Sequence, residues 1–133
     1  LDELFERSDY VTVHAPMLPE TEKMIGRSQL QRMKLGAVMV NTSRGRVIDS
    51  EALLEVLRAG RIYALLDVTD PEPLPADSPF RQLPNCFITP HISGAGHYGY
   101  FQIGATTRQA IEDLFAGRTP KGLVPLEIYS RIA

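Results

Sequence analysis

The sequence contains no tryptophan and a single cysteine, Cys86, in 133 residues. One cysteine cannot form a disulfide within the chain, so we expect the protein in the reducing cytoplasm. Neither a CxxC nor an HExxH motif occurs, and we therefore expect no metal site. No apolar run approaches the roughly 20 residues of a membrane-spanning helix. Residues 1–3 do not resemble a signal peptide, so no membrane partner is expected.

The sequence also lacks an excess of charge of either sign. Lysine and arginine together number 14 and aspartate and glutamate 16, which gives a net charge of -2. A nearly neutral chain has no basic surface of the kind that binds nucleic acid, so no nucleic-acid partner is expected. With 44% hydrophobic and 23% charged residues, the composition excludes a disordered chain. The length alone predicts about one domain.

Short apolar runs alternate with amphipathic segments along the chain. Strands that are apolar on both faces and alternate with helices favour a parallel sheet covered by helices. The predicted fold class is therefore α/β, with a Rossmann-like three-layer parallel sheet. Strands are expected at residues 10–14, 37–41, 62–66 and 86–89. Helices are expected at residues 2–7, at 28–33 with Ser28 as the cap, and at 98–116. A further helix is expected to begin after a cap at Asp49 or Ser50 and to end at Gly60.

Polar and ionisable residues follow each of the four predicted strands. In open α/β sheets ligands bind beyond the carboxyl ends of the strands, and these ends share one edge. We therefore expect these residues to converge on one site. They are His14 and Pro16 after the first strand, Thr42, Ser43 and Arg44 after the second, Asp67 and Glu72 after the third, and His91 and Gly94 after the fourth.

Four of these residues have side chains suited to catalysis or to binding a ligand, and each also has a structural interpretation. The Arg44 guanidinium suits a carboxylate, or makes a surface salt bridge. His91 suits general acid and base catalysis, although most loop histidines are structural or solvated. Glu72 either favours the His91 imidazolium and holds its orientation or is a solvated loop carboxylate. Asp67 closes an apolar strand, where a buried acid needs a partner or ligand, or it caps a turn.

The weaker candidates have mainly conformational alternatives. Thr42 and Ser43 either present hydroxyls or backbone amides to a cofactor or cap the bend. His14 is the weakest candidate, because a histidine before Ala-Pro can serve only to shape the loop. Residues 94–99 match GxGxxG literally, but no strand with a terminal acid follows some 20 residues later. We therefore reject this motif as a pyrophosphate loop. Gly94 still allows the backbone to approach a ligand closely.

The ordered blocks 33–45, 64–73 and 89–91 together resemble the D-isomer-specific 2-hydroxyacid dehydrogenases. This family includes glyoxylate/hydroxypyruvate reductases, D-lactate dehydrogenases and phosphoglycerate dehydrogenases. The resemblance covers nearly the whole chain. It implies an oxidoreductase that transfers a hydride between NAD or NADP and a small D-2-hydroxy acid or 2-keto acid.

The resemblance also implies a role for each candidate residue. Arg44 would bind the substrate carboxylate, Glu72 would pair with His91, and His91 would transfer the proton. Asp67 would contact the nicotinamide carboxamide. Formate-oxidising relatives pair their histidine with glutamine, so Glu72 argues against formate. The implied lining of the cofactor cleft is His14, Pro16, Thr21, Thr42, Ser43, Arg44, Asp67, His91 and Gly94.

Family members run to more than twice this length, so the resemblance implies a fragment. Residues 1–118 would form the C-terminal half of a Rossmann NAD(P)-binding domain, and residues 119–133 a tail returning toward a missing substrate domain. The full-length protein would be a homodimer. The strand end that selects the cofactor ribose would be absent, which leaves NAD and NADP both open. The alternative is a non-enzymatic dinucleotide-sensing module, because corepressors of this family can retain the catalytic residues.

We expect the 133-residue chain on its own to lack dehydrogenase activity, because the implied substrate domain and the GxGxxG half are absent. The assay is reduction of pyruvate or hydroxypyruvate with NADH and NADPH. Measurable turnover by this chain alone would refute the fragment interpretation.

Overall fold

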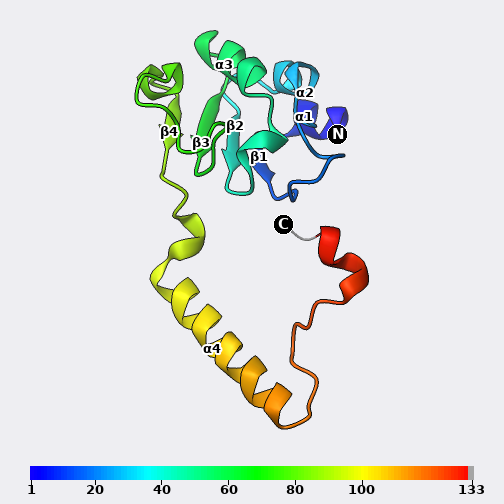
Figure 1. Cartoon of the computed structure of the whole chain (residues 1–133). Helices are drawn as coiled ribbons and strands as arrows, with labels where there is room; N and C mark the ends of the chain where they lie inside the picture. Colours follow the sequence, from blue (N-terminus) through cyan, green and yellow to red (C-terminus); the bar gives the residue numbers. More distant parts are fainter. Residues whose placement is uncertain (132–133) are drawn as a thin grey trace. The chain divides into compact units, whose positions relative to one another are not determined.

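The computed structural model describes residues 1–131 and divides into two compact units, Leu1–His91 and Ile92–Ala133 (Figure 1). The first unit alternates strands and helices, and the described part of the second contains one long helix and two short 3-10 helices. The elements of the first unit are α1 (Asp2–Arg7), β1 (Tyr10–Val13), α2 (Arg27–Arg32), β2 (Val38–Asn41), the 3-10 helix η1 (Gly45–Val47), α3 (Ser50–Arg58), β3 (Tyr63–Leu66), η2 (Pro79–Gln82) and β4 (Cys86–Ile88). The second contains η3 (Ser93–Ala95), α4 (His97–Phe115) and η4 (Leu126–Arg131).

The four strands form one parallel sheet in the order β1-β2-β3-β4. Val11 lies opposite Met39, which lies opposite Ala64, so the strands are in register across the sheet. Parallel pairing brings all four carboxyl ends to one edge, as the sequence predicted. The α/β class with a parallel sheet is therefore confirmed.

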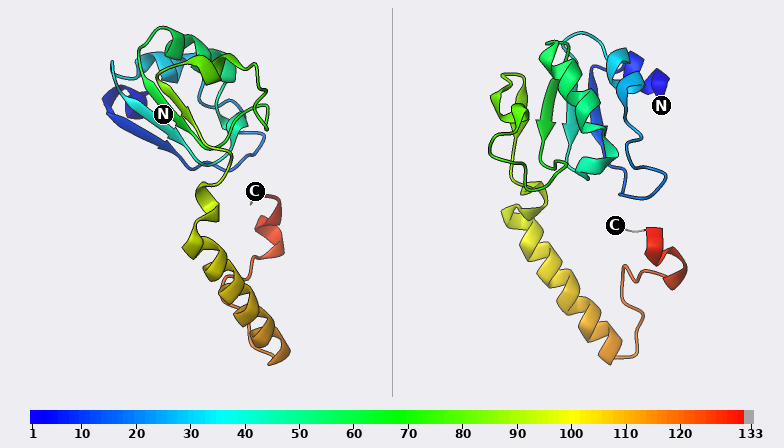
Figure 2. Two further views of the ribbon diagram at one scale, coloured as in Figure 1. Left: turned by 90° about the vertical axis from the view of Figure 1, so that its left-hand side faces the viewer. Right: turned by 45° about the horizontal axis from the view of Figure 1, so that its top comes forward.

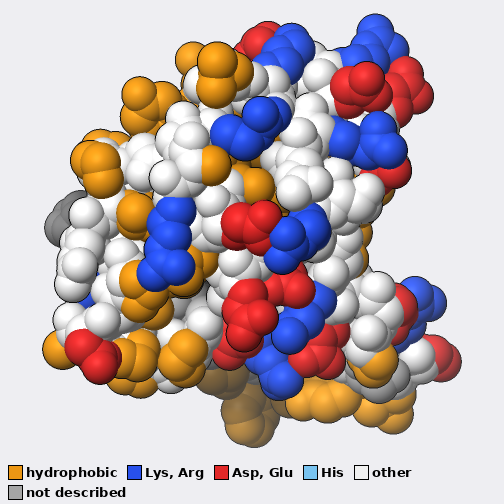
Figure 3. Space-filling model, turned by 90° about the horizontal axis from the view of Figure 1, so that it is seen from above, with side chains coloured by type: hydrophobic (Ala, Val, Ile, Leu, Met, Phe, Trp, Pro, Cys, Tyr) orange, Lys and Arg blue, Asp and Glu red, His pale blue; other side chains and the backbone are white. Residues whose placement is uncertain are grey.

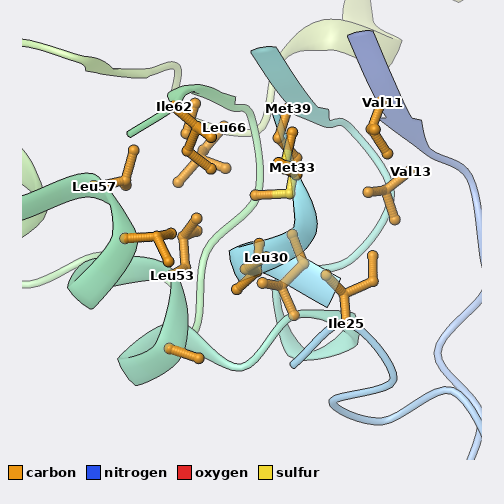
Figure 4. Close-up of a cluster of buried hydrophobic side chains, with 14 of the residues drawn as sticks. Val11, Val13, Ile25, Leu30, Met33, Met39, Leu53, Leu57, Ile62 and Leu66 are labelled. Atoms are coloured by element: carbon orange, nitrogen blue, oxygen red, sulfur yellow. The ribbon is translucent and has the colours of Figure 1, made fainter. Parts of the chain in front are cut away.

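One face of the sheet packs against helices α1, α2 and α3, which lie on the same side (Figure 2). Alternate residues of the strands are buried on this face, so the sheet supplies one side of the hydrophobic core and the helices supply the other. Figure 4 shows how side chains from the strands and helices point toward one another in this core. Its most buried large members include Leu30, Met33, Met39, Leu57 and Ile62, each at most 1% exposed.

The opposite face of the sheet is apolar and exposed within this unit. Tyr63, Leu65 and Phe87 are 48%, 40% and 58% exposed. Leu65 and Phe87 are direct cross-strand neighbours, so they form a continuous apolar surface. The helices of this unit thus supply one layer beside the sheet, and none of them covers the second face.

The ends of the helices follow local side-chain chemistry. The Asp49 carboxylate accepts the amides of Glu51 and Ala52 at 3.0 and 3.1 Å, which caps α3 as predicted. Gly60 follows α3 with a φ of 67°, a left-handed conformation that glycine adopts without a steric penalty. The predicted Ser28 cap is wrong. Helix α2 begins two residues earlier than predicted, with Gly26 as its N-cap, and the Gln29 side chain accepts the Gly26 amide at 3.1 Å.

Charged side chains of both signs lie beside one another on the outer surface (Figure 3). Arg27 pairs with Glu55 at 2.5 Å, and Lys34 pairs with Asp9 at 2.8 Å. These pairs are exposed, so each contributes little to stability. Among the described residues, no helix is both long enough and apolar enough to cross a membrane.

Replacing Asp49 with Ala should lower the free energy of unfolding by about 1 kcal/mol, because the first turn of α3 loses the acceptor for two amides. Asp49→Asn keeps a capping oxygen and should retain most of this free energy. Urea titrations followed by circular dichroism measure the difference. Equal stability of the alanine and asparagine variants would contradict the capping role.

Candidate active site

Asp67 occupies the edge of the sheet directly after β3. Its amide donates to the Asn41 carbonyl at 2.9 Å, and its own carbonyl accepts the His91 amide at 2.9 Å. The Thr89 hydroxyl donates to the Asp67 carboxylate at 2.5 Å. Asp67 is only 5% exposed, so this hydrogen bond compensates part of the cost of burying a carboxylate. The predicted need of a buried acid for a partner is thus met by Thr89.

His91 and Glu72 lie in direct contact. The distance between His91 Nδ1 and Glu72 Oε1 is 2.5 Å, with the side chains 48% and 40% exposed. Both line a pocket of about 330 Å³ at the carboxyl ends of β3 and β4, together with Asp67. Because a carboxylate only accepts hydrogen bonds, the Nδ1 proton of the imidazole points at Glu72. This contact fixes the orientation of the ring and leaves Nε2 for other chemistry.

The backbone of His91 is in a strained conformation. Its φ of 53° lies in the left-handed region, which a residue with a side chain adopts at a cost of about 1–3 kcal/mol. The His91 amide offsets this cost by donating to the carbonyls of Asp67 and Thr89 at 2.9 and 3.1 Å. Such strain concentrates at functional sites, where the surrounding structure holds it.

Arg44 lies on the turn that follows β2. Asn41 organises this turn: its side-chain amide donates to the Arg44 carbonyl at 2.9 Å, and its side-chain oxygen accepts the Ser43 amide at 3.0 Å. Arg44 itself is exposed, and its guanidinium donates to the Ser43 carbonyl at 2.9 Å. The Ser43 hydroxyl donates to the Ala15 carbonyl and joins this turn to the one after β1.

Gly45 brings the Arg44 turn against the segment that follows β3. A Cβ at Gly45 would lie 2.0 Å from the Thr69 carbonyl oxygen, so only glycine fits here. Thr69 lies between Asp67 and Glu72 in the sequence. The close approach therefore places the arginine turn beside the segment that carries the two acids, although Arg44 does not line the 330 Å³ pocket.

The remaining candidates lie at three places. His14 is exposed after β1 and contacts the Thr12 hydroxyl at 3.1 Å, and Thr42 is exposed after β2. The Thr21 hydroxyl donates to the Pro16 carbonyl at 2.6 Å and so closes the loop that follows β1. Gly94 is exposed in η3 of the second unit, so its place in the site stays a prediction.

The chain is similar to known proteins in both sequence and structure. The sequence model described as "D-isomer specific 2-hydroxyacid dehydrogenase, NAD binding domain" matches residues 1–93. The chain belongs to this family. The match includes Arg44, Glu72 and His91.

Relatives and solved structures agree with this family. A glyoxylate reductase of Korarchaeum cryptofilum is 40% identical over 129 residues, which are 96% of this chain and 39% of that protein. A D-lactate dehydrogenase with NAD+ from Lactobacillus jensenii superposes with a TM-score of 0.85 at 28% identity, over 94% of this chain and 42% of that one. A D-isomer specific 2-hydroxyacid dehydrogenase from Xanthobacter autotrophicus in complex with NADPH superposes with a TM-score of 0.81 at 32% identity. The superposition covers 94% of this chain and 51% of that chain.

These likenesses confirm the Rossmann-like fold class. The chain spans about 39% of the length of the curated relatives it matches. The division at residue 118 stays a prediction.

The sequence analysis missed three residues that organise the site. Asn41 ends an apolar strand, and an asparagine at this position is a recognisable signal for a turn that its side chain stabilises. Thr89 binds Asp67, which is distant in sequence, and Arg81 binds the carbonyls of a nearby proline-rich loop, which has no regular pattern, so no local motif identifies either residue. Cys86 is not a candidate nucleophile, because burial raises the pKa of its thiol to about 11 and keeps it protonated at neutral pH. Within residues 1–131, no cluster of His, Cys, Asp or Glu is suited to a metal ion.

Gly45→Ala should destabilise the first unit by about 2–3 kcal/mol, because the new Cβ forces the Arg44 turn away from Thr69. Gly104→Ala in α4 is the matched control. A Cβ there meets no atom within 4 Å, and alanine favours a helix by about 0.5–1 kcal/mol over glycine. Chemical denaturation of both variants measures the difference. A fully stable Gly45→Ala protein would show that the close approach is not required.

Proposed function

We propose that the protein containing this chain transfers a hydride between NAD(P)(H) and a small D-2-hydroxy acid or 2-keto acid. The observation that carries the proposal is the 2.5 Å contact between His91 and Glu72 at the carboxyl edge of the sheet. A paired imidazole and carboxylate in a pocket suit general acid and base catalysis. The similarity to a glyoxylate reductase and a D-lactate dehydrogenase supports this substrate class.

The residues at this edge fit a nicotinamide dinucleotide. Asp67 is a buried carboxylate that lines the pocket, and a carboxylate accepts the hydrogen bonds that a carboxamide donates. Thr42, Ser43 and the loop residues His14, Pro16 and Thr21 lie after the neighbouring strands and would line the same cleft. When bound, the nicotinamide ring supplies the carbon that gives or accepts the hydride. Similar structures hold NAD+ or NADPH, so both cofactors belong in the test.

His91 handles the proton in this mechanism. The Glu72 carboxylate accepts a hydrogen bond from Nδ1–H and stabilises the imidazolium, so Nε2 is the atom that exchanges a proton with substrate. In reduction, Nε2 protonates the ketone oxygen as the hydride reaches the adjacent carbon; in oxidation, Nε2 removes the hydroxyl proton. Arg44 binds the substrate carboxylate with its planar guanidinium and stabilises the charge that develops on the ketone oxygen.

Glu72 also bears on substrate choice. The family resemblance links formate oxidation to a glutamine partner for the histidine, and this chain has a carboxylate. We therefore propose a 2-keto acid rather than formate as the substrate. A homodimer of the full-length protein remains part of the proposal and rests on the family resemblance alone.

The full-length protein should reduce glyoxylate, pyruvate or hydroxypyruvate with NADH or NADPH. His91→Ala should lower kcat roughly 100- to 10,000-fold, because the general acid is lost. Cofactor affinity, measured by quenching of nicotinamide fluorescence, should change little. Arg7→Met is the control, since Arg7 forms an exposed ion pair with Glu3 on α1.

Two outcomes would contradict this proposal. Unchanged turnover in His91→Ala would remove His91 from the mechanism. Tight dinucleotide binding without reduction of any of the three acids would favour the dinucleotide-sensing module instead.

A further inference from the structure

Arg81 binds the backbone just beyond Glu72. Its Nε donates to the Pro75 carbonyl at 2.9 Å, and its Nη2 donates to the Leu74 carbonyl at 2.8 Å. One guanidinium thus holds two consecutive carbonyls, an arrangement that a planar fork of donors makes with little loss of rotamer freedom. Leu74 lies two residues after Glu72, so the hydrogen bonds act on the loop that carries the carboxylate.

The backbone of Arg81 is itself well anchored. Arg81 belongs to η2, and its amide donates to the Ser78 carbonyl at 3.1 Å. The neighbouring residue, Phe80, is 8% exposed and belongs to the hydrophobic core. The guanidinium therefore extends from a fixed base to the loop.

The loop needs such an anchor because it has few hydrogen bonds of its own. Pro71, Pro73 and Pro75 have no amide proton, so this segment cannot join a strand or helix. Before Glu72, the Ser50 hydroxyl holds the Asp70 carbonyl at 3.1 Å. After Glu72, the Leu74 side chain is buried in the core, the Ser78 amide donates to the Pro75 carbonyl at 3.1 Å, and Arg81 holds the Leu74 and Pro75 carbonyls.

Arg81 also lines the pocket that contains the catalytic candidates. The ionisable side chains of that lining are Asp67, Glu72, Arg81 and His91. Arg81 thus lines the same pocket as Glu72, but its Nε and Nη2 bind backbone oxygens and not the Glu72 carboxylate. Its effect on the carboxylate therefore passes through the loop.

We propose that Arg81 is a positioning residue: by holding the Leu74 and Pro75 carbonyls, it keeps the Glu72 carboxylate against His91 Nδ1. Arg81 touches no reacting atom in this role. The inference rests on the proposed function for its kinetic consequences, but the position of Glu72 can be measured without turnover.

The kinetic test uses Arg81→Met, which keeps the aliphatic stem and removes every donor, in the full-length protein. We expect kcat to fall about 10- to 100-fold while the KM for the cofactor stays within about twofold, because misplaced catalytic groups slow the chemical step. Arg81→Lys keeps a charged donor group but not the planar fork, and should restore part of kcat. Arg7→Met, on an exposed arginine outside the site, should leave both constants unchanged.

A double-mutant cycle with Glu72 separates positioning from a general loss of stability. If Arg81 acts through Glu72, Arg81→Met should lower kcat no further in a Glu72→Gln background. A full additional loss in the double variant would overturn the proposal. Should Arg81→Met fail to fold, as judged by urea unfolding, Arg81→Lys carries the same cycle.

Proton NMR reports the contact itself. The His91 Nδ1 proton, hydrogen-bonded to Glu72, should give a downfield resonance that weakens or disappears in Arg81→Met and persists in Arg7→Met. An unchanged resonance would overturn the positioning role. If the wild-type protein reduces no 2-keto acid, the proposed function fails, and this resonance still decides the role of Arg81.

Discussion

The hydrogen bonds of Asp67 connect three turns at the carboxyl edge of the sheet. Its amide binds the end of β2, its carbonyl binds the His91 amide, and its carboxylate binds the Thr89 hydroxyl. A buried polar group left without a partner costs about 1–3 kcal/mol, so these bonds are strongly retained once the core has formed. The register of the parallel strands thus determines where the histidine lies, and the strained backbone of His91 persists because Asp67 holds it.

Arg44 and Glu72 depend on a different kind of support. Neither residue lies on a strand, so the sheet alone does not place them. The Arg44 turn is fixed by Asn41 and by the absence of a side chain at Gly45, which allows contact with the Thr69 backbone. The Glu72 loop is held by a serine hydroxyl on one side and by Arg81 on the other. The pair of His91 and Glu72 therefore combines a histidine held by the sheet with a carboxylate held by side chains.

The sequence predicted the sheet well because its strands are short apolar runs between clear turn signals, and such patterns are local. The prediction that polar residues gather after the strands also follows from topology alone. The functions of Thr89 and Arg81 were not predictable in this way, because each uses a side chain to bind a group in another segment, and that partner is defined only after folding. Asn41 binds within its own turn, where an asparagine is a recognisable local signal. The N-cap of α2 was misplaced because a glutamine side chain, rather than Ser28, closes its first turn.

The exposure of His91 and Glu72 limits the free energy that their ion pair can contribute. His91 and Glu72 are 48% and 40% exposed, and an ion pair in water gains little from Coulomb attraction. In this state Glu72 acts mainly as a hydrogen-bond acceptor that selects the tautomer with a proton on Nδ1. The same pair becomes electrostatically stronger when water is excluded, since the effective dielectric constant falls. Binding of cofactor and substrate over the pocket would therefore strengthen the support that Glu72 gives to the imidazolium at the stage when His91 transfers its proton.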